Sequence, residues 1–218
     1  PFQLPSEIVV MCDVAKRIVH DELLPLEPQY LQHPGHSFGT NQTATNLKLV
    51  FGQDVLDHLT KISRETGLWY LMVPEEHGGS GLSMLAQIAI MEQFNYTAVP
   101  FPFAHVANIL YQSEGDQVDR FLKPVIEGEK ITCFAQTEPN AGSDPGGMMQ
   151  THAVQDGDEW VLNGTKMWIS GAAESDIIMV QAVTDKEKRQ RGGITMFLVD
   201  RNNPGVTIEE PGIQTWLG

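Results

Sequence analysis

The chain has 218 residues, of which 41% are hydrophobic and 19% are charged, and its formal net charge at pH 7 is −14. This composition is typical of a globular protein with one or two domains and a buried core, and it excludes an intrinsically disordered chain. The net negative charge excludes sequence-independent binding to nucleic acid, which needs a basic surface.

The first half of the chain has apolar residues at helical spacing. Ser6 is predicted to cap a first helix, which Pro25 and Pro28 are expected to end. A second helix is predicted through residues 47–62, with its stop at Gly67.

Further short helices are predicted in the rest of this half. Residues 31–45 are rich in Gly, His, Asn and Thr and are predicted to form a loop. Ser83 is predicted to cap a third helix. Two shorter helices are expected at residues 104–111 and 117–126, and Gly115 separates them.

After residue 130 the pattern changes to the alternation of β-strands, and Asp156-Gly157 and Asn163-Gly164 are strong turn signals. The predicted strands are residues 151–155, 159–170, 177–184, 194–199 and 205–209. We therefore predict an α+β chain, with an all-α domain over residues 1–130 and a small β-barrel-like domain or folded sheet over residues 131–218.

The positions of the cysteines and histidines argue against a metal site. Cys12 and Cys133 are far apart and lack the spacing of a metal site, so we expect buried thiols in a reducing compartment. The seven histidines show no ligand-like pairing, so we expect no metal. Since no apolar run reaches the roughly 18 residues that span a bilayer, we expect no stable membrane insertion, and we expect no signal peptide.

The most informative stretch is Thr137-Glu138-Pro139-Asn140-Ala141-Gly142-Ser143-Asp144, which follows a predicted strand that begins near Cys133. Such a turn exposes backbone N–H groups and adds hydroxyls, a combination that suits a ring edge or a phosphate. The alternative is an ordinary polar turn at the end of a strand.

A second candidate is Lys166-Met167-Trp168-Ile169-Ser170-Gly171. Trp168 follows a predicted hairpin, and its indole is suited to packing against a planar cofactor. The alternative is a tryptophan that packs in the core or at the edge of the sheet.

Residues 137–144, followed by Asn163-Gly164-Thr165-Lys166-Met167-Trp168-Ile169-Ser170, closely resemble the acyl-CoA dehydrogenase family, and residues 67–69, 73–79 and 81–83 resemble the loop of that family's helical domain. The resemblance implies helical N-terminal and middle β-domains. It also implies a C-terminal four-helix bundle that is not present in this chain. FAD is the implied cofactor, and a homodimer or homotetramer is the implied assembly.

The resemblance implies FAD-dependent α,β-dehydrogenation of an acyl-CoA thioester to the trans-2-enoyl-CoA, with electrons passed to an electron-transfer flavoprotein. Two alternatives stay open: an acyl-CoA oxidase or flavin monooxygenase-like relative, or a non-catalytic fragment that binds CoA or a partner. The compartment is open between a bacterial cytoplasm and the mitochondrial matrix, and the acyl chain length cannot be inferred.

The resemblance also assigns site residues. Trp168 would shield one face of the flavin ring, Ser170 would hydrogen-bond the ring, and Ser143 would contact the cofactor or the acyl-CoA. The implied cofactor-binding residues are Phe134, Ala135, Gln136, Thr137, Ser143, Trp168, Ile169 and Ser170.

Four positions depart from the family pattern. Phe134 stands where tyrosine is common, and Gln136 where a small apolar residue is common. Asn140 replaces a frequent glycine and tolerates a left-handed backbone. Ser170 replaces a frequent threonine but keeps the hydroxyl.

The family's catalytic glutamate is expected beyond Gly218, so the chain is assigned no catalytic residue. Glu138 and Asp144 are instead expected to stabilise their loop. The basic run around Arg191 is predicted to be either a solvated hairpin tip or a contact to the CoA phosphates, with Ser143 and Arg191 as the implied substrate-binding residues.

Overall fold

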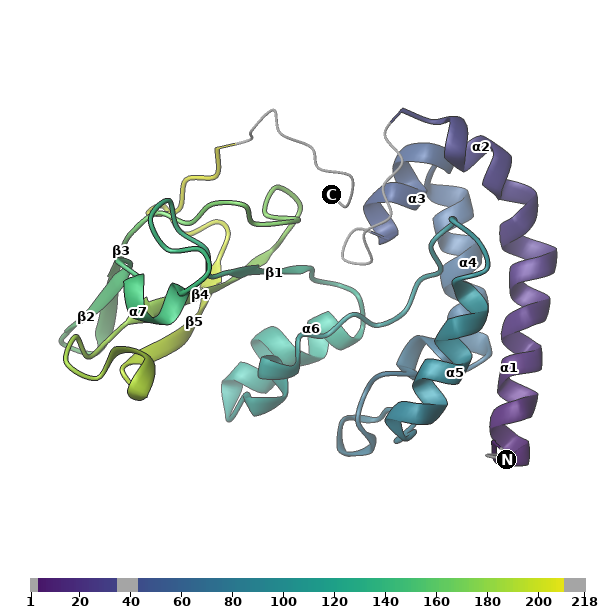
Figure 1. The fold of residues 1–218 in the computed structure, drawn as a ribbon, viewed down its shortest axis with the longest axis horizontal. Coiled ribbons are helices and arrows are strands. Elements are labelled where there is room, and N and C mark those ends of the chain that lie inside the picture. Colours follow the sequence, from purple (N-terminus) through teal and green to yellow (C-terminus); the bar gives the residue numbers. More distant parts are fainter. Residues whose placement is uncertain (1–3, 35–42, 210–218) are drawn as a thin grey trace. The chain divides into compact units, whose positions relative to one another are not determined.

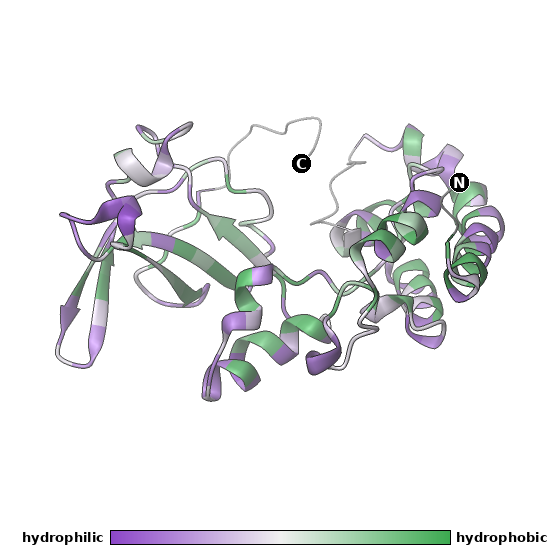
Figure 2. Ribbon diagram, turned by 60° about the horizontal axis from the view of Figure 1, so that its bottom comes forward, coloured by the Kyte–Doolittle hydropathy of each residue, from purple (hydrophilic) through white to green (hydrophobic). Residues whose placement is uncertain are grey.

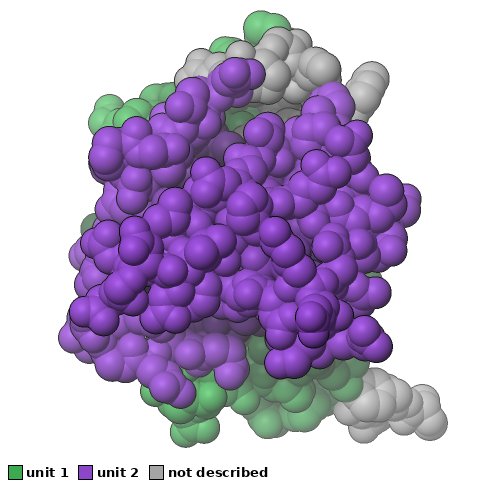
Figure 3. Space-filling view, turned by 90° about the vertical axis from the view of Figure 1, so that its left-hand side faces the viewer, with its two compact units in different colours: residues 1–106, 213–218 green, residues 107–212 purple. Residues whose placement is uncertain are grey.

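The computed structural model describes residues 4–34 and 43–209, which group into two compact units. The first unit ends at Val106 and the second begins at Ala107 (Figure 3). The change from helices to strands falls later, between Ile126 and Thr132. The domain boundary predicted at residue 130 stays a prediction.

The first unit is helical, as predicted, and α1 packs against α5 and α3 against α4 (Figure 1). Its α-helices are α1 (Ser6–Ile18), α2 (Glu27–Gln32), α3 (Thr43–Phe51), α4 (Gln53–Glu65) and α5 (Met84–Phe94). The residues predicted as a loop at 31–45 fall partly in α2 and α3, and positions 35–42 lie outside the described residues.

The beginning and end of the first helix differ from the sequence prediction. Ser6 is the first helical residue, and Pro5 precedes it without a side-chain cap. Pro25 and Pro28 do not end the helical path, so that prediction was wrong. A π-helical turn at Val19–Leu23 follows α1, and each proline then occupies the first turn of a new segment. That position is compatible with proline because the N–H it lacks has no partner there.

The second predicted helix is two helices, because Gly52 separates α3 from α4 with φ +91°. A residue with a side chain rarely adopts this backbone conformation, which glycine adopts readily. The predicted stop at Gly67 is confirmed, since Gly67 is left-handed at φ +76° just after α4. Ser83 caps α5 as predicted, and its Oγ accepts a hydrogen bond from the Ala86 N–H at 3.3 Å.

Hydrophobic residues of the helices form one core in the first unit, and Figure 2 shows them in green among hydrophilic residues in purple. Tyr30, Leu23, Leu59 and Ile90 are fully buried in this core. Three phenylalanines pack against one another at its edge, with ring centroids 4.6 to 5.3 Å apart. These rings belong to Phe94, Phe101 and Phe103.

The second unit begins with helical turns and continues as a mixed five-stranded sheet. Residues 104–107 are not helical, whereas a 3₁₀ turn at Asn108–Gln112 and a π-helical turn at Val118–Leu122 precede α6 (Lys123–Ile126). Gly115 separates the two helical regions, as predicted, with φ +56°. The strands are β1 (Thr132–Ala135), β2 (His152–Asp156), β3 (Glu159–Asn163), β4 (Ile177–Val183) and β5 (Ile194–Asp200).

Strand β4 pairs with three of the other strands of the sheet. It pairs in parallel with β1 and, at its last residue, with the start of β2, while β5 pairs with it in antiparallel fashion along its whole length. The predicted Asp156-Gly157 turn is confirmed, because it joins the antiparallel strands β2 and β3 and Gly157 has φ +60°. Two predicted strands are wrong in extent: β3 ends at Asn163, and residues 205–209 form no strand.

Both cysteines are free and buried, as predicted. Burial raises the pKa of the Cys12 thiol and of the Cys133 thiol. Cys133 and Ala135 of β1 pack with Ile178 of β4 in the core of the sheet. Within residues 4–34 and 43–209 there is no helix long and apolar enough to cross a membrane. The same residues hold no group of three or more His, Cys, Asp or Glu side chains arranged for a metal ion.

Candidate functional site

The turn that follows β1 is closed by its own backbone. The Glu138 N–H donates to the Ala141 carbonyl and the Ala141 N–H donates to the Glu138 carbonyl, both at 3.1 Å. Pro139 and Asn140 occupy the bend between them, with exposed side chains. The polar segment predicted to be a turn is therefore a tight, fixed turn at the end of a buried strand.

The second segment, residues 163–170, lies directly against this turn. The Met167 N–H donates to the Thr137 carbonyl at 2.9 Å. Lys166 Nζ donates to the Gln136 carbonyl at 3.0 Å and to Glu138 Oε1 at 2.8 Å. The structure therefore brings together the two segments that the sequence analysis singled out.

Glu138 is the buried anchor of this contact, with only 5% of its surface exposed. Its carboxylate also accepts hydrogen bonds from the N–H groups of Gln150 at 2.6 Å and Thr151 at 3.0 Å. Burial alone would raise the pKa of Glu138, but hydrogen bonds from Lys166, Thr151 and Gln150 outweigh it and lower the pKa to about 2. A carboxylate held this way is ionised and poorly suited to accept a proton. The prediction that Glu138 stabilises the loop is confirmed.

Lys166 is the functional residue that sequence reasoning missed. Burial lowers the pKa of its ammonium group, and the neighbouring Glu138 opposes that effect. Its side chain is 10% exposed and makes two contacts with the first segment, to the Gln136 carbonyl and to Glu138 Oε1; the Met167 N–H adds a third contact between the two segments. No local signal in the sequence identifies this pairing, because the tertiary fold brings Lys166 and Glu138 together.

Trp168 is more exposed than Phe134, the other aromatic residue assigned to the flavin. Its side chain is 61% exposed, and its backbone has φ +61°, a left-handed conformation that is uncommon for a residue with a side chain. Among the described non-glycine residues, only Trp168 and Arg189 have positive φ. Ser170 is also exposed, whereas Ile169 between them packs against the core of the sheet. Of the alternative that Trp168 packs in the core or at the edge of the sheet, the core position is therefore wrong.

Exposure differs among the last two residues of β1 and the two that follow it. Phe134 is 46% exposed, while Ala135 is buried in the core, so Ala135 can reach a ligand only through its backbone. Gln136 is half-buried, and its Nε2 donates to Gln181 Oε1 of β4 at 2.7 Å. Thr137 is half-buried as well.

Ser143 lies on the exposed part of the turn, just before the short helix α7 (Pro145–Met148). Asp144 caps this helix, since its Oδ1 accepts a hydrogen bond from the Gly147 N–H at 3.0 Å. The prediction that Asp144 has a structural role is confirmed.

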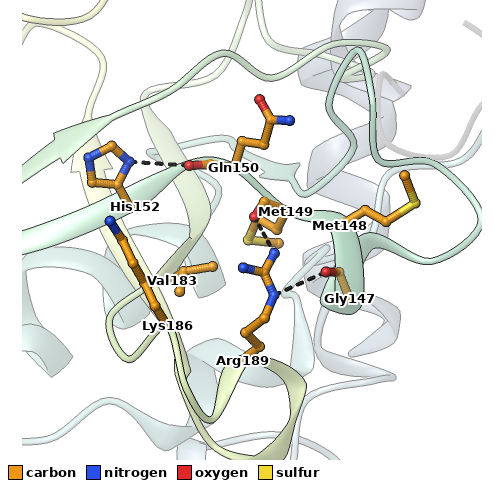
Figure 4. A pocket seen from close by; sticks show the side chains of 8 residues that line it. All are labelled: Gly147, Met148, Met149, Gln150, His152, Val183, Lys186 and Arg189. Atoms are coloured by element: carbon orange, nitrogen blue, oxygen red, sulfur yellow. Dashed lines mark hydrogen bonds between the residues drawn. The ribbon is translucent and has the colours of Figure 1, made fainter.

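A cavity of about 580 Å³ lies beside α7 (Figure 4). Its lining residues come from α7, β2, β4 and the hairpin tip after β4: Gly147, Met148, Met149, Gln150, His152, Val183, Lys186 and Arg189. Arg189 Nε donates to the Gly147 carbonyl at 3.0 Å and its Nη2 to the Met149 carbonyl at 2.7 Å. Arg191 is exposed at the hairpin tip and does not line this cavity; its role in substrate binding stays a prediction.

The side chains of these residues have the chemistry that binding a flavin ring requires. Phe134 and Trp168 expose aromatic surface, and Ser143 and Ser170 expose hydroxyls, on a scaffold that the Lys166–Glu138 ion pair fixes. Backbone strain at an exposed aromatic residue is a feature that often accompanies a binding site.

Comparison with protein-family models matches both halves of the chain. Residues 44–129 match the model described as "Acyl-CoA dehydrogenase, N-terminal domain", and residues 133–215 match "Acyl-CoA dehydrogenase, middle domain". The chain spans about half the length of the curated relatives it matches.

Individual relatives and structures agree with these matches. The chain is 41% identical to the short-chain specific acyl-CoA dehydrogenase of mouse over 213 residues, covering 94% of this chain and 47% of that protein. It is 37% identical to a subunit of the caffeyl-CoA reductase-Etf complex of Acetobacterium woodii, covering 72% and 42%. The glutaryl-coenzyme A dehydrogenase structure with glutaryl-CoA superposes with a TM-score of 0.68 and 25% identity, covering 94% and 49%.

Proposed function

The chain belongs to the acyl-CoA dehydrogenase family, and on that premise we propose that it supplies one wall of the FAD site of an enzyme that oxidises acyl-CoA thioesters. The reaction is α,β-dehydrogenation to the trans-2-enoyl-CoA. The observation that supports the proposal is the contact of residues 166–167 with the turn after β1, in which the Met167 N–H donates to the Thr137 carbonyl and Lys166 Nζ pairs with Glu138.

Each residue of this wall has a proposed task. Trp168 packs against one face of the flavin ring, and the Ser170 hydroxyl hydrogen-bonds the ring. Phe134, Gln136, Thr137 and the backbone of Ala135 and Ile169 line its edge. These residues would hold FAD, which would supply the hydride acceptor for the β-carbon of the substrate. The protein's own contribution is to hold the ring and to exclude water from it.

Ser143 is proposed to bind the acyl-CoA or the cofactor through its exposed hydroxyl. Removal of the α-proton requires a base and stabilisation of the charge that develops on the thioester oxygen. We assign the base to neither Glu138 nor Asp144, because the first is ionised in a buried ion pair and the second caps α7.

We propose that an electron-transfer flavoprotein accepts the electrons and that the complete enzyme is a homodimer or homotetramer. The similarity to a subunit of an Etf complex favours the first point. Mitochondrial and bacterial relatives leave a mitochondrial matrix or a bacterial cytoplasm as the proposed compartment.

Anaerobic titration of the full-length protein with acyl-CoAs of different lengths tests the function. We expect the visible flavin absorption to bleach. The acyl-CoA that bleaches it at the lowest concentration identifies the preferred chain length. Rapid reoxidation of the reduced protein by oxygen would instead indicate an oxidase. A protein that retains no flavin would contradict the proposal.

A further inference from the structure

The hairpin tip between β4 and β5 is built around Asp185. Asp185 Oδ1 accepts hydrogen bonds from the N–H groups of Glu187 at 3.0 Å and Lys188 at 3.1 Å, and the Asp185 carbonyl accepts one from the Arg189 N–H at 2.9 Å. These bonds fix the backbone of the tip, which places Arg189 in a left-handed conformation with φ +45°. A non-glycine residue is held there only where the surroundings determine it.

The Arg189 side chain leaves its own hairpin and binds α7. Its two donors reach two different carbonyls, those of Gly147 and Met149, at the C-terminal end of this short helix (Figure 4). Carbonyls at the end of a helix have no partner within the helix, and a cation there is favourable. The tip also packs closely on α7, since a Cβ at Gly146 would lie 2.9 Å from Gln190 Cβ.

The segment from Ser143 to Thr151 is therefore fastened at three points. Asp144 caps its helix, Arg189 holds the middle, and Glu138 binds the N–H groups of Gln150 and Thr151 at its end. Of the three residues that form these hydrogen bonds, only Arg189 lies in the hairpin tip. Ser143 is the first residue of this segment, and residues 147–150 of the same segment line the cavity.

We propose that Arg189 is a positioning residue: its guanidinium fixes the backbone of residues 147–149 and thereby sets Ser143 and the cavity wall for binding CoA. This inference rests on the proposed function and, of the two ligands proposed there for Ser143, takes CoA. Lysine cannot replace arginine in this role, because it presents one point charge instead of a planar fork that reaches two carbonyls at once. Arg189 acts through the backbone of α7 and is assigned no contact with substrate.

The test compares R189K and R189A with K188A in the full-length protein. K188A is the matched control, since it removes a charge from the same tip without touching α7. It also removes the ion pair of Lys188 Nζ with Asp185 Oδ2 at 3.2 Å, which is exposed and is expected to contribute little. Hydrogen exchange measures how fast the backbone amides of residues 147–149 exchange with solvent, and a peptide from β4 and β5 serves as the internal reference. Calorimetric titration with coenzyme A and optical titration with FAD report the two ligands separately.

We expect R189K to exchange the α7 amides about tenfold faster and to bind coenzyme A about tenfold more weakly, the change expected for a lost hydrogen bond to a charged group. FAD affinity, the β4–β5 reference and all properties of K188A should stay unchanged. R189A should show the same pattern, more strongly.

Coenzyme A binding by R189K as tight as that of the wild type would overturn the inference alone. Equal losses of FAD and coenzyme A affinity would also overturn it, since they would indicate general loosening of the fold. A wild-type protein that binds neither ligand would overturn the proposed function as well, and that failure is recognisable without any substitution.

Discussion

Lys166 Nζ lies 2.8 Å from Glu138 Oε1, and the two side chains are 10% and 4% exposed. This buried ion pair joins two segments that are 28 positions apart in the sequence. It fixes the turn after β1 against the strained backbone at Trp168. We expect the proposed flavin wall to depend on this contact as well as on the residues that would touch the flavin.

Replacing Lys166 with methionine should destabilise the second unit by about 3 kcal/mol, because it leaves the Glu138 carboxylate buried without its counter-ion. Urea unfolding of K166M and wild type measures the difference. K123M is the matched control, since Lys123 forms an exposed ion pair with Asp119 at 2.6 Å and such pairs contribute little. Equal effects of the two substitutions would contradict the assigned role of Lys166.

Acid should destabilise the protein through Glu138. The pKa of Glu138 is about 2 in the folded protein, below its ordinary value of 4.5. Its contribution is therefore fully present above pH 4.5 and is lost as the pH falls toward 2. We expect E138Q, although less stable, to lose less further stability than wild type over this range. If the free energies of unfolding of the two proteins fell in parallel with pH, Glu138 would not be the group that causes the loss of stability in acid.

Glycine substitution at Trp168 should separate folding from binding. W168G relieves the positive φ, so we expect unfolding stability to be unchanged or raised by about 1 kcal/mol. FAD binding should fall sharply, because the exposed indole is the proposed surface for the ring, and W168F should retain most of it. Flavin titration and thermal unfolding of both variants test this. Undiminished FAD affinity in W168G would remove Trp168 from the site.

Gly164 should not tolerate a side chain. A Cβ there would lie 2.6 Å from Thr151 Cβ and 2.7 Å from Thr151 Cα, so β2 and residue 164 would have to separate. We expect G164A to cost about 2 kcal/mol, the range of overpacked positions. G142A is the control in the neighbouring turn, since a Cβ at Gly142 meets nothing within 4 Å. Comparable stabilities of the two variants in urea would refute the close approach.

Local signals in the sequence located most of the elements. Ser83 capped the predicted helix, and Asp156-Gly157 made the predicted hairpin, because caps and tight turns depend on adjacent residues. The same local reasoning failed at Pro25, where a π-helical turn shifted the chain so that proline began a new segment. It also missed the break at Gly52, which looks like one more small residue in a helical pattern.

The candidate site was predictable in its segments but not in its connections. The pairing of Lys166 with Glu138 and the reach of Arg189 to α7 depend on the tertiary fold, which no local pattern encodes. Arg189 also lies in a run of charges that resembles a solvated tip. The exposure of Trp168 was equally hidden, since tryptophan in a β-rich region usually packs inside.

The central claim is that Lys166 and Glu138 hold two segments together as one wall of an FAD site. It is tested most directly by titrating FAD into wild type and K166M under conditions where circular dichroism shows both to be folded. The account predicts that wild type binds FAD and that K166M binds it at least tenfold more weakly, by about 1.4 kcal/mol or more. Equal FAD affinity in the two proteins would contradict it.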